Sequence, residues 1–189
     1  SRIVEYDGDI DPTIILSKRD KVKRINDEKH GELSVVDMRT YNMIIRIPTY
    51  EDLKKHGFNS YDAGSAIKIF KESNIYDETL EIKIGDQVIC TKNISGNIVN
   101  GSQGIVIRIS ISGYPIVRFL NGVVEEMTRH DVPHDTIPGL SFSQVPLTYA
   151  WALTIHKCQG MSLDICQMDL GSDIFADGQA YVALSRVKT

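Results

Sequence analysis

The chain has 189 residues, of which 42% are hydrophobic, and this allows one ordinary domain or one domain that carries a small inserted one. Its net charge of −4 argues against a protein that binds nucleic acid through its overall field, so phosphate contacts must come from a local cluster or from backbone amides. No apolar stretch reaches the roughly 20 residues of a membrane span, and no signal-peptide pattern opens the chain. We therefore expect a soluble, intracellular protein of the nucleus, the cytoplasm or a viral factory, with no membrane partner.

The first region, residues 1–78, has the texture of an α/β unit. Residues 14–16 predict a short strand, and Asp20 is placed to cap a helix that continues to Glu32. That helix would carry on one face the residues Val22, Ile25, Lys29 and Leu33. Further along, we expect short helices over residues 50–56 and 63–70. The adjacent acids Asp77 and Glu78 follow polar sequence rather than a buried apolar strand, so they are interpreted as a loop and not as a magnesium-binding strand end.

The second region, residues 79–139, alternates with the period of strands. We expect strands over residues 80–84, 87–91, 105–111, 116–120 and 123–127. Asn100-Gly101 and Asn121-Gly122 supply two hairpin signals between them. Several short strands separated by turns at this spacing predict a small β-barrel or sheet.

The third region, residues 140–189, returns to α/β texture. Residues 148–156 are apolar almost all round, which predicts a buried helix and makes Trp151 a core residue rather than a base-stacking one. A strand is expected over residues 165–170. A second helix is expected over residues 179–185, ending at Arg186.

Metal binding by side chains is not indicated. Cys90, Cys158 and Cys166 have neither an even count nor CxxC spacing, which fits a reducing compartment without disulfides. His130 and His134 form the other conceivable metal pair, but Pro133 prevents a regular helix across them and no third ligand lies nearby in the sequence. We therefore predict no protein-held metal site.

Two long motifs carry the functional signal. The segment Leu147-Thr-Tyr-Ala-Trp-Ala-Leu-Thr-Ile-His-Lys-Cys-Gln-Gly160 is followed by Gly178-Gln-Ala-Tyr-Val-Ala-Leu-Ser-Arg186. Together they resemble the last two motifs of superfamily 1 helicases, in the Pif1 and RecD-like branch. The run 15–26 adds a weak match, and the runs 83–94 and 99–106 add a third, independent match that resembles the SH3-like domain inserted in the second motor domain of this branch. The resemblance implies a RecA-like second motor domain formed by residues 1–78 and 140–189, with an SH3-like β-domain inserted at residues 79–139.

The same resemblance assigns jobs to the first motif. Thr154 and His156 would hydrogen-bond a nucleic-acid phosphate, with donors that suit sequence-independent contact, and Lys157 would add charge. Gln159 and Gly160 would line the nucleotide cleft, where a residue without Cβ permits close backbone approach. Cys158 stands where the family usually has serine, and Arg19 stands where the family usually has asparagine.

Arg186 is the predicted arginine finger. Phosphoryl transfer accumulates negative charge on the equatorial oxygens, and a planar guanidinium from a neighbouring domain stabilises it.

ATP and Mg²⁺ are the implied cofactors. No Gly-Lys dipeptide occurs in the chain, so the phosphate-binding loop is absent from it. The resemblance thus implies the C-terminal part of a monomeric 5′–3′ DNA helicase, inactive alone and partnered by single-stranded DNA or junctions and by an N-terminal RecA-like domain of the same protein.

Secondary contacts are expected from the second region. Lys92 and Asn93 at a strand end, and Ser102 and Gln103 near Gly101, are candidate phosphate contacts, with solvated turn residues as the equally weighted alternative. The basic residues between 18 and 24 are either a solvated helix face or a flank of the nucleic-acid channel.

Two other functions compete with the helicase interpretation. One is a non-catalytic nucleic-acid-binding or interaction module. The other is an RNA-binding barrel, and the low aromatic content of the strands argues against it.

Overall fold

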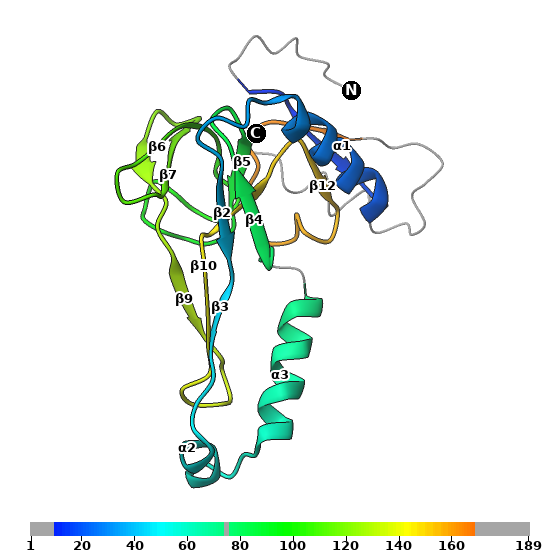
Figure 1. Ribbon diagram of the computed structural model, residues 1–189. Coiled ribbons are helices and arrows are strands. Elements are labelled where there is room, and N and C mark those ends of the chain that lie inside the picture. The colour runs from blue at the N-terminus through cyan, green and yellow to red at the C-terminus, as the bar shows by residue number, and fades with distance from the viewer. Residues whose placement is uncertain (1–9, 74–75, 169–189) are drawn as a thin grey trace.

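The computed structural model describes residues 10–73 and 76–168, and its α/β part is built on a three-stranded parallel sheet. The strand order is β12-β1-β13, with β1 (Thr13–Leu16) between β12 (Ala152–Thr154) and β13 (Cys166–Met168). Helix α1 (Arg19–Glu32) follows β1 and contacts β12 (Figure 1). The strand and the helix expected in this region are confirmed. The helix expected over residues 179–185, and Arg186 with it, lie outside the described residues.

The start of α1 differs from expectation. Lys18 is the N-cap residue and makes no side-chain capping bond, while Asp20 lies inside the first turn. Asp20 is therefore not the cap, although a carboxylate there still complements the positive end of the helix dipole. The only fully buried residue of α1 is Asn26. The helix is thus fixed to the sheet by a polar contact, while the apolar residues of its inner face are only partly buried.

The second part is a five-stranded antiparallel sheet of order β11-β5-β6-β7-β8. Its strands are β11 (Leu147–Tyr149), β5 (Gln87–Cys90), β6 (Gln103–Ile109), β7 (Pro115–Phe119) and β8 (Val124–Glu126). Asn121-Gly122 connects β7 and β8 as expected, with Gly122 at φ 84°. Within the described residues the sheet is open, since β11 and β8 form its two edges, so of the two expected forms the structure shows a sheet and not a closed barrel.

A two-stranded ribbon packs on this sheet. It pairs β2 (Arg39–Asn42) with β4 (Thr79–Ile82) in antiparallel register. Ribbon and sheet share one apolar core, whose largest members include Tyr41, Leu80, Ile82, Ile98, Phe119, Met127 and Leu147. Leu147 belongs to β11, so a strand from beyond residue 139 completes the sheet that residues 79–139 begin.

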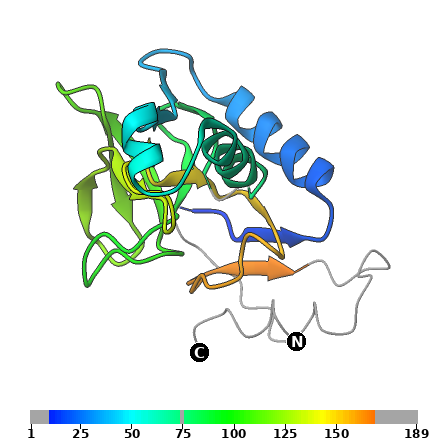
Figure 2. The ribbon, with the colours of Figure 1, turned by 90° about the horizontal axis from the view of Figure 1, so that it is seen from below.

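A third sheet forms an arm that extends from the rest of the molecule (Figure 1). The arm comprises residues 44–72 and 130–144, with β3 (Ile44–Arg46), β10 (Ser141–Gln144) and β9 (His130–Pro133) in the order β3-β10-β9. Helix α2 (Tyr50–Lys55) lies at its far end, and α3 (Ser60–Glu72) returns toward the sheets (Figure 1). In Figure 2, which views the molecule from below, α3 is seen almost end-on. The arm has its own core, formed by Leu53, Ala63, Ala66, Ile137, Leu140 and Phe142.

The two short helices expected in this region are confirmed, although α3 begins at Ser60, before the expected start at residue 63. Thr49 caps α2 by accepting the backbone N–H of Asp52. Asn59 and Asp62 form a reciprocal capping box at the start of α3. Phe70 near the end of α3 stacks on Phe142 of β10, with ring centroids 3.6 Å apart. The caps fix where the two helices begin, and the stacking holds the C-terminal end of α3 against the sheet of the arm.

The buried helix expected over residues 148–156 is wrong. This run forms two strands in different sheets: β11 pairs antiparallel with β5, and β12 pairs parallel with β1. Most of the segment is buried because it passes from one sheet to the other, and a continuous apolar run of this length fits both a buried helix and buried strands. Trp151 lies between the two strands and is only 7% exposed, which confirms it as a core residue.

Buried glutamine side chains join the two sheets. The Gln103 Nε2 group donates to Thr13 Oγ1 at 2.7 Å and to the Ile165 carbonyl at 2.8 Å. Its Oε1 accepts the backbone N–H groups of Asp164 and Ile165 at 3.0 and 2.9 Å. Gln87 donates to the carbonyls of Asp11 and Ala150. These amides satisfy backbone groups between the sheets, as buried polar atoms require.

Among the described residues, no helix has the length and apolarity to cross a membrane.

Candidate nucleic-acid interface

The segment that follows β12, residues 155–160, is a run of turns anchored at its inner side. Ile155 and Cys158 are buried in the α/β core, whereas His156, Gln159 and Gly160 are exposed. The Ile155 N–H donates to the Leu16 carbonyl at 3.0 Å, and the Cys158 N–H donates to the Thr154 carbonyl at 3.1 Å. Apolar anchors and backbone bonds therefore present the polar side chains of the motif on the surface.

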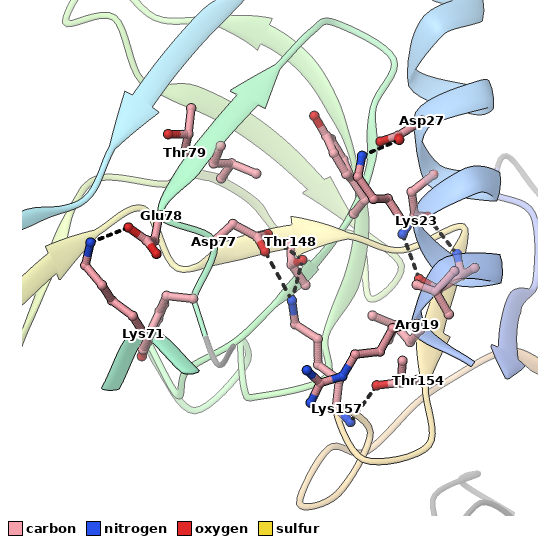
Figure 3. Close-up of a pocket in the computed structure, with 17 residues that line it drawn as sticks. Arg19, Lys23, Asp27, Lys71, Asp77, Glu78, Thr79, Thr148, Thr154 and Lys157 are labelled. Carbon is pink, nitrogen blue, oxygen red and sulfur yellow. Dashed lines mark hydrogen bonds and ion pairs between the residues drawn. The ribbon is translucent and has the colours of Figure 1, made fainter. Parts of the chain in front are cut away.

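A cleft of about 530 Å³ opens beside this segment, between α1, β11, β12 and residues 76–80 (Figure 3). A second pocket of about 270 Å³ adjoins it. Three residues line both: Arg19, Thr154 and Lys157. His156 and Gln159 line the second pocket. The structure thus brings together four residues predicted from the motif, and it adds Arg19 from the start of α1.

Lys157 is paired inside the cleft. Its ammonium lies 3.5 Å from Asp77 Oδ1 and donates to Thr148 Oγ1 at 3.0 Å (Figure 3). The Thr148 hydroxyl in turn donates to Asp77 Oδ2 at 2.8 Å. The side chains of Lys157 and Asp77 are 20% and 35% exposed, so the pair is partly open to the cleft. The lysine expected to face nucleic acid therefore has a carboxylate beside it.

Asp77 itself lies outside any strand, which confirms the interpretation of Asp77-Glu78 as a loop. Its backbone carbonyl accepts the Gln144 Nε2 group at 2.8 Å, and the same amide donates to the Tyr41 carbonyl at 2.9 Å. Glu78 pairs instead with Lys71 of α3. The two neighbouring acids thus have separate lysine partners.

Two buried polar atoms near the smaller pocket have no partner among the described residues: Thr91 Oγ1 and Asn100 Oδ1. Both residues line that pocket, and Thr91 is 7% exposed. A buried polar atom without a partner costs free energy, so such atoms in a pocket often mark where a ligand supplies the missing bond. Neither residue was expected at the site from the sequence, because Thr91 falls in an expected strand and Asn100 in an expected turn.

The turn around Asn100 is fitted closely to the end of the motif. Asn93 Oδ1 accepts the Asn100 N–H at 2.8 Å, and Asn100 donates to the Gly160 carbonyl at 3.5 Å. Gly101 has φ 104°, and a Cβ there would lie 2.6 Å from the backbone N and O of Ser162. The β-sheet loop therefore buttresses the motif segment. Gly160 has φ 79° with open space around it, so glycine is required there by conformation rather than by close packing.

The other expected phosphate contacts lie apart from the cleft. Lys92 donates to the Asp131 carbonyl at 3.3 Å. The Ser102 hydroxyl accepts the Val99 N–H at 2.9 Å, and Ser102 is only 9% exposed. Gln103 is fully buried with all its polar atoms bonded, so the expectation that it meets phosphates is wrong. Neither Lys92 nor Ser102 lines the two pockets around Thr154.

The two buried thiols, those of Cys90 and Cys158, have low reactivity. Burial raises the pKa of Cys90 to about 11 and that of Cys158 to about 12. Both thiols are therefore neutral at physiological pH and are poor nucleophiles. Cys158 acts in the motif as a packing residue of the α/β core.

Comparison with known proteins gives these residues a family. No protein-family model matches the chain. The ATP-dependent DNA helicase PIF1 of Danio rerio is 36% identical over 192 residues, which cover 98% of this chain and 27% of that protein. The chain spans about a quarter of the length of the curated relatives it matches.

Solved structures agree with the sequence relatives. The crystal structure of Pif1 helicase from Candida albicans matches with a TM-score of 0.71 at 28% identity, over 99% of this chain and 45% of that chain. Pif1 helicase from Bacteroides in complex with ADP-AlF3 and ssDNA matches with a TM-score of 0.59 at 28% identity, over 100% of this chain and 41% of that chain. These likenesses and the mixed helices and strands fit an α/β, RecA-like domain. The chain belongs to the Pif1-like branch of the superfamily 1 helicases.

Proposed function

We propose that the chain is the second motor domain of an ATP-dependent DNA helicase, which moves 5′ to 3′ on single-stranded DNA. The observation that carries the proposal is the shared wall of the two pockets, where Arg19, Thr154 and Lys157 stand side by side. Relatives named as ATP-dependent DNA helicases, and a similar structure that holds ssDNA, support it.

The cleft has the donors that a phosphodiester backbone needs. A hydroxyl at Thr154, an imidazole at His156 and cations at Lys157 and Arg19 bind phosphate oxygens without reading the bases. Because the net charge of the chain is negative, these local groups must supply the attraction that the overall field does not. Single-stranded DNA is therefore the proposed ligand of the wall formed by these side chains.

Gln159 and Gly160 are proposed to face the nucleotide. Both are exposed, and the open space at Gly160 leaves the backbone accessible to a ligand. When bound, ATP with Mg²⁺ would supply the free energy of translocation through its hydrolysis. Most of the contacts to its phosphates are assigned to an N-terminal RecA-like domain of the same protein, because this chain lacks a Gly-Lys phosphate loop. Arg186, outside the described residues, is the proposed arginine finger.

Residues 79–139 are proposed to form the SH3-like insertion of this motor domain, with residues 1–78 and 140–189 forming the RecA-like part. The antiparallel pairing of β5, β6, β7 and β8 supports the insertion. The contact of the 99–102 turn with Ser162 supports a role in holding the motif segment in place.

The test is DNA-stimulated ATP hydrolysis by the full-length protein. Arg186→Ala should abolish stimulated turnover while nucleotide binding, followed with a fluorescent ATP analogue, stays near the wild-type value. Residues 1–189 alone should not hydrolyse ATP. Stimulated turnover at the wild-type rate in Arg186→Ala would overturn the assignment of the finger. Full-length protein that binds ssDNA without hydrolysing ATP would instead favour the non-catalytic binding module.

A further inference from the structure

We propose that Asp77 is a positioning residue that competes with nucleic-acid phosphate for Lys157. Without DNA its carboxylate stands beside the lysine ammonium, and a phosphate of the bound strand replaces it as the nearest anion. The inference rests on the proposed function, in which Lys157 faces single-stranded DNA.

The geometry of Lys157 leaves room for this exchange. An ammonium has three donors, and here one bonds Thr148 Oγ1 at 3.0 Å while the contact with Asp77 Oδ1 is a long 3.5 Å. The pair is partly exposed on the cleft side. A phosphate oxygen can therefore approach the ammonium from the cleft without removal of a tight ion pair.

The carboxylate is the fixed member of the pair. Asp77 is held through its backbone carbonyl by Gln144 and through its side chain by the Thr148 hydroxyl. Lys157 projects its long, flexible side chain from a run of turns. Movement of the ammonium toward the strand would thus leave Asp77 in place, ready to receive it again when the phosphate departs.

Asp77 differs from the other acids of the cleft in its position. Asp27 pairs with Lys23 one helical turn away on the exposed face of α1, and Glu78 pairs with Lys71 of α3. Neither lysine lines the second pocket, whereas Lys157 lines both pockets beside Thr154. Asp77 is therefore the carboxylate whose charge acts on the shared wall.

Such a competitor suits a protein that must release the strand as often as it grips it. The nearby negative charge weakens each phosphate contact at Lys157, and the waiting carboxylate offers the ammonium a partner during release. The effect on affinity is modest for a partly exposed pair, and we expect a change of roughly two- to fivefold.

The test measures binding of a 5′-fluorescein dT oligonucleotide to the full-length protein by anisotropy over a series of salt concentrations. Asp77→Asn keeps an acceptor for Thr148 and removes the charge. It should bind roughly two- to fivefold more tightly at low salt, with a slope of log K against log salt that steepens by up to about 0.7. Glu78→Gln, which removes the adjacent charge, should match wild type.

A double-mutant cycle separates the two hypotheses. In the Lys157→Met background the gain from Asp77→Asn should vanish. Unchanged affinity or slope in Asp77→Asn, or a gain that persists in Lys157→Met, would overturn the inference. Unchanged affinity of Lys157→Met alone would instead refute the assignment of Lys157 to DNA. If Asp77→Asn fails to fold, as judged by thermal unfolding, Asp77→Ser takes its place with the same expected outcomes.

Discussion

The side chain of Asn26 closes two hydrogen bonds on the backbone of Ala152. Its Nδ2 donates to the Ala152 carbonyl at 3.0 Å, and its Oδ1 accepts the Ala152 N–H at 2.9 Å. Asn26 lies in α1 and Ala152 begins β12, so one side-chain amide holds the helix against the strand that precedes the turns of residues 155–160. Arg19 at the start of α1 and Thr154 at the end of β12 are thereby held on one wall of the cleft.

Asn26→Ala should destabilise the protein by about 2–4 kcal/mol, because it leaves a buried N–H and a buried carbonyl without partners. Urea unfolding, followed by circular dichroism, measures the change. Glu28→Ala removes an exposed side chain of the same helix and should stay within about 0.5 kcal/mol of wild type. An equal loss in both variants would show that the two hydrogen bonds from Asn26 to Ala152 are not responsible.

The hairpin at Asn121-Gly122 was predictable from the sequence, because it forms with the conformation that glycine favours. The helix α3 was expected, but its start at Ser60 was not, because the capping box of Asn59 and Asp62 was overlooked. The structure of residues 148–156 was not predictable, because it depends on strand pairing with β5 and β1, which lie far away in the sequence. Period alone does not distinguish a strand buried on both faces from a buried helix.

The candidate site divides in the same way. Thr154, His156, Lys157 and Gln159 were predictable because one short motif carries them. Arg19 reaches the site from the start of α1, and Thr91 reaches it from the position directly after β5, so only the folded chain brings them there. No periodic sequence pattern marks an asparagine that hydrogen-bonds a distant backbone, as Asn26 does, or a buried threonine hydroxyl without a partner, as in Thr91.

Thr91→Val should weaken binding of single-stranded DNA by roughly three- to tenfold, if the unpartnered hydroxyl bonds a phosphate oxygen. Stability should stay equal or rise slightly, since valine keeps the shape and removes a buried polar atom without a partner. Anisotropy with a labelled dT oligonucleotide and urea unfolding measure the two effects. Thr40→Val on the exposed face of β2 is the control. Unchanged affinity with raised stability would mean that the hydroxyl meets no ligand.

Cys90 and Cys158 should resist alkylation in the native protein. With pKa values near 11 and 12, well above the ordinary thiol value, only about one thiol in a thousand or fewer is ionised at pH 8. Iodoacetamide labelling with peptide mass mapping should show both protected until urea unfolds the chain. Rapid labelling of native Cys158 at pH 8 would contradict its burial.

The same pKa shifts predict a direction for stability at alkaline pH. A thiol whose pKa is raised in the folded state stabilises the fold fully below the unfolded pKa, about 8.5. Above that value the unfolded thiols ionise while the native ones stay neutral, so this contribution falls as pH rises toward the folded values. Replacement of both cysteines by alanine should flatten the decline in urea midpoint between pH 8.5 and 11. A decline as steep as in wild type would assign it to other groups.

Gly101→Ala tests whether the sheet loop holds the motif segment. Gly101 and Gly113 both have positive φ, at 104° and 83°, but only at Gly101 would the added Cβ meet backbone, 2.6 Å from Ser162 N and O. Gly113→Ala should therefore cost only the conformational strain of about 1–2 kcal/mol. Gly101→Ala should cost more and should also weaken binding of single-stranded DNA, because Ser162 and the preceding turns must move. Equal stability losses, with DNA affinity unchanged in both variants, would show that the contact with Ser162 does not position the segment that ends at Gly160.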